Sequence, residues 1–565
     1  MEKNLRVIVV GGVACGPKTA ARLRRLMPSA DITLVERGKL VSYGSCGLPY
    51  YVEGTFTNIK ALTETPAGLL RTPEFFDATK GFRVRIGTEA IRIDREKKLL
   101  RVRDLDTKVE EDLPYDKLVL ATGGSPFRPP IPGIDLENVW FMTHPDEAEG
   151  LVRSVQSQGL RKAVLVGAGF IGIEMAEALI SRGLDVTVVE MADQILPGIL
   201  DPDIARFAQI HLEDNDVVLA LGERVTALEG EGKVSAVVTN AGKIETDLVV
   251  IGVGTRPNTQ LAQEAGLLCR NGIVVNEYGQ TTDPDIYAGG DCVVNSYVNH
   301  LVGEPLYVPL GSTANKHGRV IANHIAGKAT PFTGITATSV LRVFEYTLGK
   351  TGLTETMARR KKLDIEVTTW AGQDIPHYMN GSRTFVIKMI ASRRDRKLVG
   401  VQVAGMGNGA KRLDVAASVI YFGGTLDQLA DIDFGYAPPY GPPLDPLAVC
   451  AHVLSNKLDG LAAGIAPLEA KEMLDSGEAL LLDVRVPDEA KMEWIPARHS
   501  IHIPISELRQ RLPEVPRDKP ILTYCKISMR GYEAQLILNE AGYRKVQFIE
   551  GGVSAWPFET EMPGL

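Results

Sequence analysis

The pattern of apolar and polar positions predicts a chain in which strands and helices alternate. Residues 5–10, LRVIVV, form an apolar run, which is followed by the helical stretch KTAARLRRL at 18–26 and by a second strand, ITLVERG, at 32–38. The same order recurs in KAVLVGAGFIGIEMAEALISRG at 162–183 and DVTVVE at 185–190. Continuous apolar strands are typical of sheets covered on both faces, so each segment predicts a β-α-β unit with parallel strands.

The periodicity changes from about residue 335, where strands follow one another without intervening helices. TFVIKMIA at 384–391 and KLVGVQVAG at 397–405 predict an antiparallel sheet. Helical patterns follow at 409–422 and 425–430. This part of the chain therefore differs in class from the β-α-β units before it.

Composition narrows the class of protein. A chain of 565 residues is too long for one core and predicts several domains. The net charge of −8, without a long Lys or Arg block, argues against a nucleic-acid binder. The first residues enter a strand without a signal-peptide pattern, and no run of about 18 apolar residues predicts a membrane span. Six cysteines without a C-x-x-C pair argue against a disulfide framework and a metal site, and favour a reducing, cytoplasmic location.

Both predicted β-α-β units carry turn glycines and, about twenty residues further on, an acid. The first set is Gly11, Gly12, Gly16 and Glu36, and the second is Gly167, Gly169, Gly172 and Glu190. Glycines let the backbone approach a pyrophosphate, the helix N-terminus offers N–H groups, and the acid holds ribose hydroxyls. Val13 stands at the middle glycine position of the first unit, where a turn without a ligand is the alternative. Glu190 favours the free 2′-hydroxyl of NADH over the 2′-phosphate of NADPH.

Two further stretches accompany these units, YDKLVLATGGSP at 115–126 and TTDPDIYAGGDC at 281–292. Together the four motifs resemble the two-dinucleotide-binding flavoprotein disulfide reductases over about residues 1–450. The resemblance implies an FAD site made of Gly11, Gly12, Val13, Ala14, Gly16, Glu36, Arg37, Ser45, Ala121, Thr122, Gly123, Gly290 and Asp291. It implies an NAD(P)H site, with NADH favoured, made of Gly167, Gly169, Phe170, Ile171, Gly172, Glu190 and Gly254. Asp291 would hydrogen-bond the ribityl chain of the flavin.

A single cysteine, Cys46, stands in VSYGSCGLPYY at 41–51, where this family brings a redox-active thiol to the flavin. Glutathione-reductase-like members carry C-x-x-x-x-C, but Val41 occupies the first position here. The motif resembles the coenzyme A disulfide reductases, although Ser45 replaces their usual Asn. Single-cysteine NADH oxidases and peroxidases are one alternative, and a buried structural thiol is another. A thiolate nucleophile needs a lowered pKa, and we expect a helix beginning after Cys46 to lower it.

The same resemblance implies contacts to coenzyme A. Arg22, Ser42 and Arg71 would contact this ligand, because the planar fork of arginine binds phosphate oxygens bidentately. For Arg24 and Arg25, on the same predicted helix as Arg22, a solvated helix face is the better explanation.

The antiparallel region resembles the dimerisation domain of the family and implies a homodimer. Within it, Tyr378 in PHYMNG and Tyr436 in GYAPPYGPPLDP match positions near the redox cysteine. A phenol there would donate a hydrogen bond or a proton to a departing thiolate. Structural packing is the alternative for both tyrosines.

The C-terminal residues resemble a single rhodanese domain over about 465–560. After the strand KPILTYC, Cys525 opens the loop CKISMR, which leads into the helical stretch YEAQLILNEAGY. In that family the loop turns backbone N–H groups toward the sulfur, which stabilises a thiolate and a persulfide. Arg530 supplies a cation at the sixth loop position, and Ser528 replaces the usual mid-loop glycine. An inactive module is the alternative.

The predicted fold class is α/β, with two Rossmann-like domains for FAD and NADH, an α+β dimerisation domain and a C-terminal α/β rhodanese domain. The expected boundaries are 1–155 with 280–334 for FAD, 156–279 for NAD(P)H, 335–455 for dimerisation, 456–464 for a linker and 465–565 for rhodanese.

The whole chain resembles fusions of coenzyme A disulfide reductase with rhodanese, including NADH-dependent persulfide or polysulfide reductases. We therefore expect a flavoenzyme that uses NADH to reduce the sulfane sulfur of polysulfide or coenzyme A persulfide to sulfide, through Cys46 and Cys525. Coenzyme A would be a bound thiol or a substrate. Coenzyme A disulfide reduction, NADH oxidase or peroxidase activity, and a sulfur sensor without turnover are the alternatives.

Overall fold

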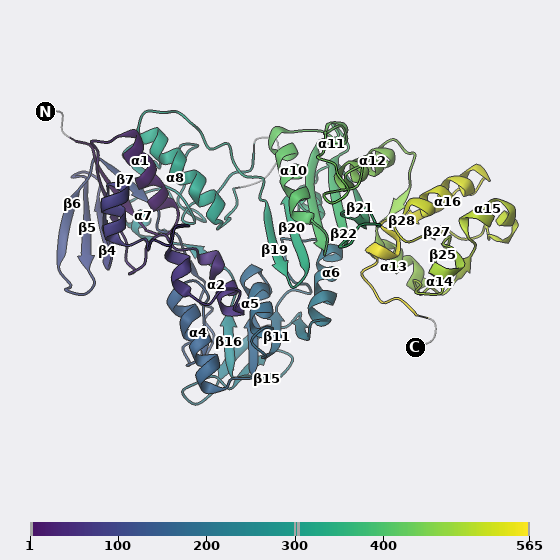
Figure 1. Ribbon diagram of the computed structural model, residues 1–565, viewed down its shortest axis with the longest axis horizontal. Helices are drawn as coiled ribbons and strands as arrows, with labels where there is room; N and C mark the ends of the chain where they lie inside the picture. Colours follow the sequence, from purple (N-terminus) through teal and green to yellow (C-terminus); the bar gives the residue numbers. More distant parts are fainter. Residues whose placement is uncertain (1–3, 299–300, 302–304, 563–565) are drawn as a thin grey trace. The chain divides into compact units, whose positions relative to one another are not determined.

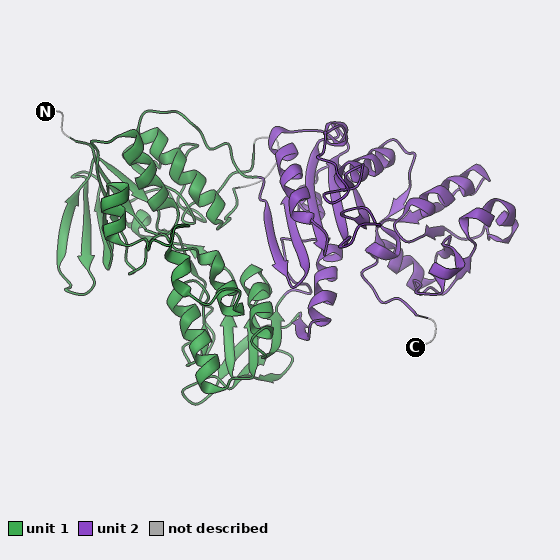
Figure 2. Ribbon diagram, in the orientation of Figure 1, with its two compact units in different colours: residues 1–191, 222–335 green, residues 192–221, 336–565 purple. Residues whose placement is uncertain are grey.

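A computed structural model describes residues 4–298, 301 and 305–562 (Figure 1). The chain divides into one unit made of residues 1–191 and 222–335, and a second made of 192–221 and 336–565 (Figure 2). Among the described helices, none is long and apolar enough to cross a membrane.

The first unit contains a five-stranded parallel sheet built from both ends of its sequence. Its strands lie in the order β18 (Ile286–Ala288), β7 (Lys117–Leu120), β1 (Arg6–Val10), β2 (Asp31–Val35) and β3 (Arg83–Arg85). Helices α1 (Cys15–Leu26) and α8 (Gly311–Ile325) pack together on one face, where Val7, Leu23 and Ile321 share a core. The antiparallel strands β4 (Thr88–Asp94), β5 (Leu99–Asp104) and β6 (Glu110–Pro114) contribute to the core on the other face.

A second parallel sheet of the same unit confirms the second predicted β-α-β unit. Its strands β11 (Asp185–Glu190), β10 (Lys162–Val166), β16 (Leu248–Ile251) and β9 (Val139–Trp140) are neighbours in that order. Helix α5 (Phe170–Ile180) follows β10, and α4 (Pro145–Gln158) precedes it. Smaller elements of the unit are β8 (Gly124–Pro126) paired with β17 (Thr255–Pro257), the sheet β13 (Val225–Glu229), β14 (Ala236–Thr239) and β15 (Lys243–Glu245), and α7 (Gln260–Glu264).

The second unit begins with the antiparallel sheet that the sequence predicts. Its strand order is β19 (Ser339–Val343), β20 (Tyr346–Gly352), β23 (Leu398–Gly405), β22 (Thr384–Ser392) and β21 (Ile365–Gln373). The helices α10 (Gly409–Phe422), α11 (Leu426–Ala430) and α12 (Pro446–Leu458) follow. The observed bounds of α10 and α11 confirm the helical pattern in the sequence.

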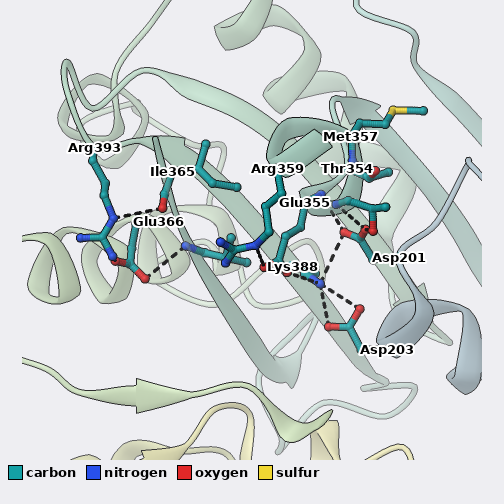
Figure 3. Close-up of polar contacts among 12 residues, drawn as sticks. Asp201, Asp203, Thr354, Glu355, Met357, Arg359, Ile365, Glu366, Lys388 and Arg393 are labelled. Atoms are coloured by element: carbon teal, nitrogen blue, oxygen red, sulfur yellow. Dashed lines mark hydrogen bonds and ion pairs between the residues drawn. The ribbon is translucent and has the colours of Figure 1, made fainter. Parts of the chain in front are cut away.

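A buried ion cluster attaches helix α6 (Pro202–Glu213) to this antiparallel sheet (Figure 3). The Nζ of Lys388, on β22, lies 2.8 Å from a carboxylate oxygen of Asp203 and 3.4 Å from one of Asp201. It also lies 2.8 Å from Glu355, at the start of α9 (Glu355–Arg360). Because buried charges are costly unless they are paired, this arrangement specifies how α6 packs. The expected boundary at 156–279 assigns segment 192–221 to the NAD(P)H domain, whereas its contacts group it with the second unit.

The second unit ends in a parallel sheet with the order β24 (Gly464–Ile465), β28 (Val546–Ile549), β27 (Ile521–Tyr524), β25 (Leu480–Asp483) and β26 (Ser500–His502). Its helices are α13 (Pro467–Ser476), α14 (Pro487–Ala490), α15 (Ile505–Arg511), α16 (Met529–Glu540) and the short 3₁₀ helix η5 (Gly552–Ala555). Helix α12 extends into the expected linker 456–464, and β24 begins at the last residue of that linker. Only a few residues therefore connect the antiparallel sheet and its helices to the parallel sheet.

Candidate functional site

The first glycine loop lies between β1 and α1 and has no room for side chains at two positions. Gly11 has φ +109°, and a Cβ there would lie 2.0 Å from the carbonyl oxygen of Ala121. A Cβ on Gly16 would lie 1.9 Å from the carbonyl oxygen of Gly11. Glu36, at the end of β2, accepts hydrogen bonds from the N–H groups of Gly12 and Gly38, each at 2.6 Å. The acid and the glycines are therefore adjacent, as the sequence spacing predicts.

The second glycine loop, between β10 and α5, repeats this geometry. Gly167 has φ +100°, and a Cβ on Gly172 would lie 1.9 Å from the carbonyl oxygen of Gly167. Glu190, at the end of β11, accepts a hydrogen bond from the N–H of Ala168 at 2.8 Å. Phe170 and Ile171 form the first turn of α5, after Gly169 as its N-cap. In each β-α-β unit, a carboxylate thus lies beside the N-terminus of a helix. Both helices have at least eleven residues.

Two more predicted segments border the first loop. Ala121, Thr122 and Gly123 follow β7, and the N–H of Ala121 donates to the carbonyl of Val10 at 2.7 Å. Gly290 and Asp291 follow β18, where Gly290 has φ +81°. Burial raises the pKa of Asp291 to about 6. The structure therefore gathers the predicted FAD residues of β1, β7 and β18 at the carboxyl ends of neighbouring strands, where ligands bind in open α/β sheets.

Sequence reasoning missed two residues that hold these turns in place. The Nδ1 of His317, on α8, accepts a hydrogen bond from the N–H of Gly290 at 3.1 Å. Asn258 bonds Thr122 twice, since its side-chain amide donates to the carbonyl of Thr122 at 2.8 Å and its own carbonyl accepts from the Thr122 hydroxyl at 2.7 Å. Neither residue belongs to a motif in the sequence, and both contacts join segments that are distant along the chain.

Cys46 lies in a 3₁₀ turn, Ser45–Gly47, that leads into α2 (Leu48–Glu53). The residue is exposed. Its segment is joined to the first glycine loop, because the N–H of Ser42 donates to the carbonyl of Gly12 at 2.7 Å. The structure thus joins the segment that carries the predicted redox cysteine to the predicted FAD loop.

The pKa of Cys46 differs from the expectation. Desolvation by the surrounding protein raises it, and the negative charge of Glu174 on α5 raises it further. Hydrogen bonds from Ser45 and from the backbone N–H of Cys46 act in the opposite direction without reversing the shift. A helix does begin after Cys46, at Leu48, but it has only six residues, and in the protein alone desolvation outweighs any lowering of the pKa by its N-terminus.

Two of the three residues expected to contact coenzyme A are in contact with each other. The Nη1 of Arg71 donates to the carbonyl of Ser42 at 2.8 Å, and Ser42 has the unusual φ of +55°. Arg22, on α1, donates through Nε to the side-chain oxygen of Asn323 on α8 at 3.0 Å. Arg71 therefore lies within the cysteine segment, whereas Arg22 also has a structural role between two helices.

The two predicted tyrosines lie on exposed loops of the second unit. Tyr378 follows β21 and is 64% exposed, and Tyr436 lies between α11 and α12 and is 52% exposed. The ring of His377 packs edge-to-face on Tyr378 with centroids 5.6 Å apart. Neither phenol packs in a core, so the alternative of a structural packing role is not supported for this chain alone.

Cys525 follows β27 directly and opens the loop before α16, as the sequence predicts. Its side chain is buried. Arg530 interacts with the Cys525 thiol and pairs in a bidentate manner with Glu489, at 2.6 and 2.8 Å. These two partners, with Glu489 first, raise the pKa of the Arg530 guanidinium. Glu489 is a partner that sequence reasoning missed.

Ser528 explains why a glycine is usual in the middle of this loop. The residue adopts φ +86°, a conformation that L side chains rarely adopt. Its Oγ accepts a hydrogen bond from the N–H of Gly551. This contact offsets part of the strain, so the loop keeps its curvature without the glycine.

Comparison with known families identifies the family to which the two glycine loops, the antiparallel sheet and the C-terminal cysteine loop belong. Residues 5–318 match the pyridine nucleotide-disulphide oxidoreductase family, residues 338–445 match its dimerisation domain, and residues 466–558 match a rhodanese-like domain. The chain belongs to the pyridine nucleotide-disulphide oxidoreductases. It is an α/β flavoprotein oxidoreductase of this family, fused to a C-terminal rhodanese-like domain. The resemblance in the sequence is thereby confirmed.

Relatives of this oxidoreductase carry several activities in their names. The chain is 34% identical to the NADH oxidase of Methanocaldococcus jannaschii over 80% of this chain and 99% of that protein. It is also 34% identical to the NAD(P)H coenzyme A polysulfide/persulfide reductase of Pyrococcus horikoshii, over 80% and 100%. The solved structure of an NAD-dependent persulfide reductase from A. fulgidus is 40% identical and has a TM-score of 0.93, over 98% of this chain and 100% of that chain. Its similarity extends through the rhodanese-like domain, since it spans nearly the whole sequence.

Proposed function

We propose that this oxidoreductase uses NADH to reduce sulfane sulfur, carried as polysulfide or as coenzyme A persulfide, to sulfide. The observation that carries the proposal is the presence of two single-thiol sites in one chain. The segment of Cys46 is hydrogen-bonded to the first glycine loop through Ser42, and Cys525 opens a loop in which Arg530 interacts with its thiol. The names of the polysulfide/persulfide and persulfide reductases that resemble this chain support the same activity.

The first glycine loop fits FAD and the second fits NADH. The space that a Cβ on Gly11 or Gly16 would fill lets the backbone approach a pyrophosphate, and Glu36 stands where it can hold ribose hydroxyls. Gly290 and Asp291 border the same site. In the second loop, Glu190 would hold the ribose of NADH and repel the phosphate of NADPH. When bound, FAD supplies the two-electron transfer that couples NADH oxidation to sulfur reduction.

The role of Cys46 is to form a mixed disulfide. Its thiolate attacks the coenzyme A sulfur of the persulfide, so that a new S–S bond forms between Cys46 and coenzyme A while the old S–S bond breaks and hydrosulfide leaves. Two electrons from NADH then cleave the mixed disulfide into the Cys46 thiolate and the coenzyme A thiolate. Because the pKa of Cys46 is raised in the protein alone, the site must lower it as ligands bind.

The role of Cys525 is to receive and pass on sulfane sulfur. Its thiolate takes the terminal sulfur of a polysulfide, or the sulfane sulfur of thiosulfate with release of sulfite, and becomes a persulfide. A coenzyme A thiolate then takes the outer sulfur and restores the Cys525 thiolate, so that no net electron transfer occurs in this half-reaction. Arg530 and the loop N–H groups stabilise the negative charge of both forms.

Several predicted residues would position coenzyme A and protonate its thiolate. Arg71 and Ser42 are joined within the cysteine segment, and Arg22 lies on α1 of the same unit. Tyr378 and Tyr436 are exposed on the dimerisation domain, which supports a homodimer. We assign the two phenols the donation of a proton to the departing thiolate.

Serine substitutions test the proposal with a matched control. We expect Cys46→Ser to abolish NADH-driven sulfide release, and Cys525→Ser to abolish thiosulfate sulfurtransfer and slow polysulfide turnover. Cys269→Ser, which removes a half-exposed cysteine far along the chain from both motifs, should change neither. Intact sulfide release in Cys46→Ser would show that the proposed thiol chemistry is wrong.

The NADH oxidase among the relatives favours a second candidate, reduction of oxygen. The two activities use the same NADH site but differ in acceptor. We expect NADH consumption to be faster with coenzyme A persulfide or polysulfide under anaerobic conditions than with air-saturated buffer alone. The reverse order would favour the oxidase, a preference for coenzyme A disulfide would favour the disulfide reductase, and no turnover with any acceptor would favour a sensor.

A further inference from the structure

The cysteine loop of the rhodanese-like domain is bordered by the short segment 550–554, which follows β28 and includes the first residues of η5. The N–H of Val553 donates to the carbonyl of Cys525, and the N–H of Ser554 donates to the carbonyl of Lys526, both at 3.0 Å. The N–H of Gly551 donates to the Oγ of Ser528. Three hydrogen bonds therefore determine the backbone path of the loop on this side.

The backbones of segment 550–554 and of the cysteine loop lie so close together that Gly552 has no room for a side chain. A Cβ on Gly552, which has φ +58°, would lie 2.2 Å from the carbonyl oxygen of Cys525. Any displacement of segment 550–554 would therefore move the loop carbonyls as well. The loop N–H groups that would stabilise a persulfide belong to the same backbone.

The first residue of this segment, Glu550, contacts the dimerisation domain. Among the described residues, its carboxylate forms no hydrogen bond with the cysteine loop. Its side chain is 2% exposed. One carboxylate oxygen accepts from the N–H of Thr369, on β21, at 2.7 Å. The other pairs with the Nζ of Lys457, near the end of α12. Both partners belong to the antiparallel sheet and its covering helix.

Lys457 completes a charged network at this junction. Its Nζ lies 3.3 Å from Glu366, which is on β21 and also pairs with Arg393 (Figure 3). Burial lowers the pKa of Lys457, but Glu550 and Glu366 together raise it above its ordinary value. Removing Lys457 leaves the buried carboxylate of Glu550 without its ion-pair partner, which is strongly destabilising, in contrast to the loss of an exposed pair.

We propose that Glu550 is a positioning residue for Cys525. Through Thr369 and Lys457 it fixes the rhodanese-like domain on the dimerisation domain, and through segment 551–554 it holds the backbone of the cysteine loop in the geometry that stabilises a thiolate. The inference rests on the sulfur-carrying role proposed for Cys525. It adds that the rhodanese-like domain is a fixed part of the second unit, so that the reactivity of its cysteine depends on docking to the neighbouring domain.

The test measures the reactivity of Cys525 and not the overall reaction. In a Cys46→Ser background, the rate of Cys525 alkylation by iodoacetamide is followed against pH by mass spectrometry. We expect Glu550→Gln and Lys457→Met each to slow the alkylation of Cys525 about tenfold at pH 7. Because the assay needs neither NADH nor a sulfur substrate, failure of the proposed sulfur reduction would not affect it.

Two further variants keep the test decisive. Asp459→Asn removes an exposed ion pair with Arg396 at the same junction and should leave the profile unchanged. The double variant Glu550→Gln with Lys457→Met leaves no unpaired charge between these two residues, so it should fold even if a single variant does not. The double variant should still show the slower alkylation, because the docking contact is lost. A wild-type alkylation profile in the folded double variant would overturn the proposal, as would an equal slowing in Asp459→Asn.

Discussion

The Oγ of Ser528 accepts a hydrogen bond from the N–H of Gly551, and it does so from a residue with φ +86°. The two effects oppose each other. A non-glycine residue in such a conformation costs about 1–3 kcal/mol, whereas a hydrogen bond to a buried backbone group contributes about 1 kcal/mol. The serine therefore retains a polar contact at the expense of backbone strain.

Ser528→Ala and Ser528→Gly separate these two effects. Ser528→Ala keeps the strain and loses the hydrogen bond, so we expect the free energy of unfolding of the rhodanese-like domain to fall by about 1 kcal/mol. Ser528→Gly loses the same bond but removes the strain, so it should be nearly neutral or slightly stabilising. Urea denaturation followed by tryptophan fluorescence gives both values. Equal destabilisation by the two variants would show that strain at Ser528 is negligible.

We expect His317 to make retention of the flavin depend on pH. Burial lowers the pKa of His317 from 6.5 to about 4, with Lys316 adding to the shift, so the ring is neutral at pH 7 and can accept from Gly290. The unfolded chain binds a proton below pH 6.5 and the folded chain does not until about pH 4. The stability contributed by neutral His317 is therefore present above pH 6.5 and is lost as the pH falls toward 4.

His317→Gln isolates this contribution. The Gln side chain can still accept from Gly290 but does not titrate, so we expect flavin release to occur at a lower pH than in the wild type. His317→Leu cannot accept and should weaken FAD binding at every pH, by about tenfold for one unsatisfied buried N–H. Asp291, whose pKa burial raises to about 6, titrates in all three proteins and so cancels in the comparison. Flavin fluorescence during acidification reports release, and identical midpoints for wild type and His317→Gln would exclude His317 as the titrating group.

The parts of this molecule that follow local patterns could be predicted from the sequence. Both β-α-β units, the helix at 409–422 and the position of Cys525 at a strand end depend on periodicity and on glycine placement, which act over short distances. The contact of Arg71 with Ser42 could not be derived from local patterns, although the resemblance implies that both residues bind coenzyme A. It depends on how a loop folds back across the cysteine segment.

The residues that the sequence did not reveal act across long separations. Glu489 and Arg530 are 41 positions apart, and they meet because β25 and β27 pair in parallel. The pKa of Cys46 is raised first by desolvation and then by the charge of Glu174, which belongs to a different β-α-β unit. Charges that are brought together by the tertiary fold leave no periodic pattern along the chain.

We expect Glu190 to set the preference between the two nicotinamide cofactors, and two variants separate its charge from its hydrogen bond. Glu190→Gln can still accept from the N–H of Ala168 but removes the negative charge, so kcat/KM with NADPH relative to NADH should rise about tenfold, or 1.4 kcal/mol. Glu190→Ala also loses the bond to the loop and should weaken both cofactors. Steady-state kinetics with the same sulfur acceptor measure the ratio. A ratio that stays at the wild-type value in Glu190→Gln would mean that the carboxylate does not face the 2′ position.

Glu489 limits the positive charge that Arg530 presents to Cys525, because the carboxylate binds both terminal nitrogens of the guanidinium. Glu489→Gln removes the opposing charge while keeping a side chain of the same shape. We expect the KM for the anion thiosulfate in sulfurtransfer to cyanide to fall, whereas Arg530→Gln should raise it about tenfold by removing the cation. Asp475→Asn, which breaks the exposed pair with Lys471 in the same domain, should change neither value. If Glu489→Gln instead raised the KM as Arg530→Gln does, the carboxylate would serve mainly to orient the arginine, and its effect on charge would be secondary.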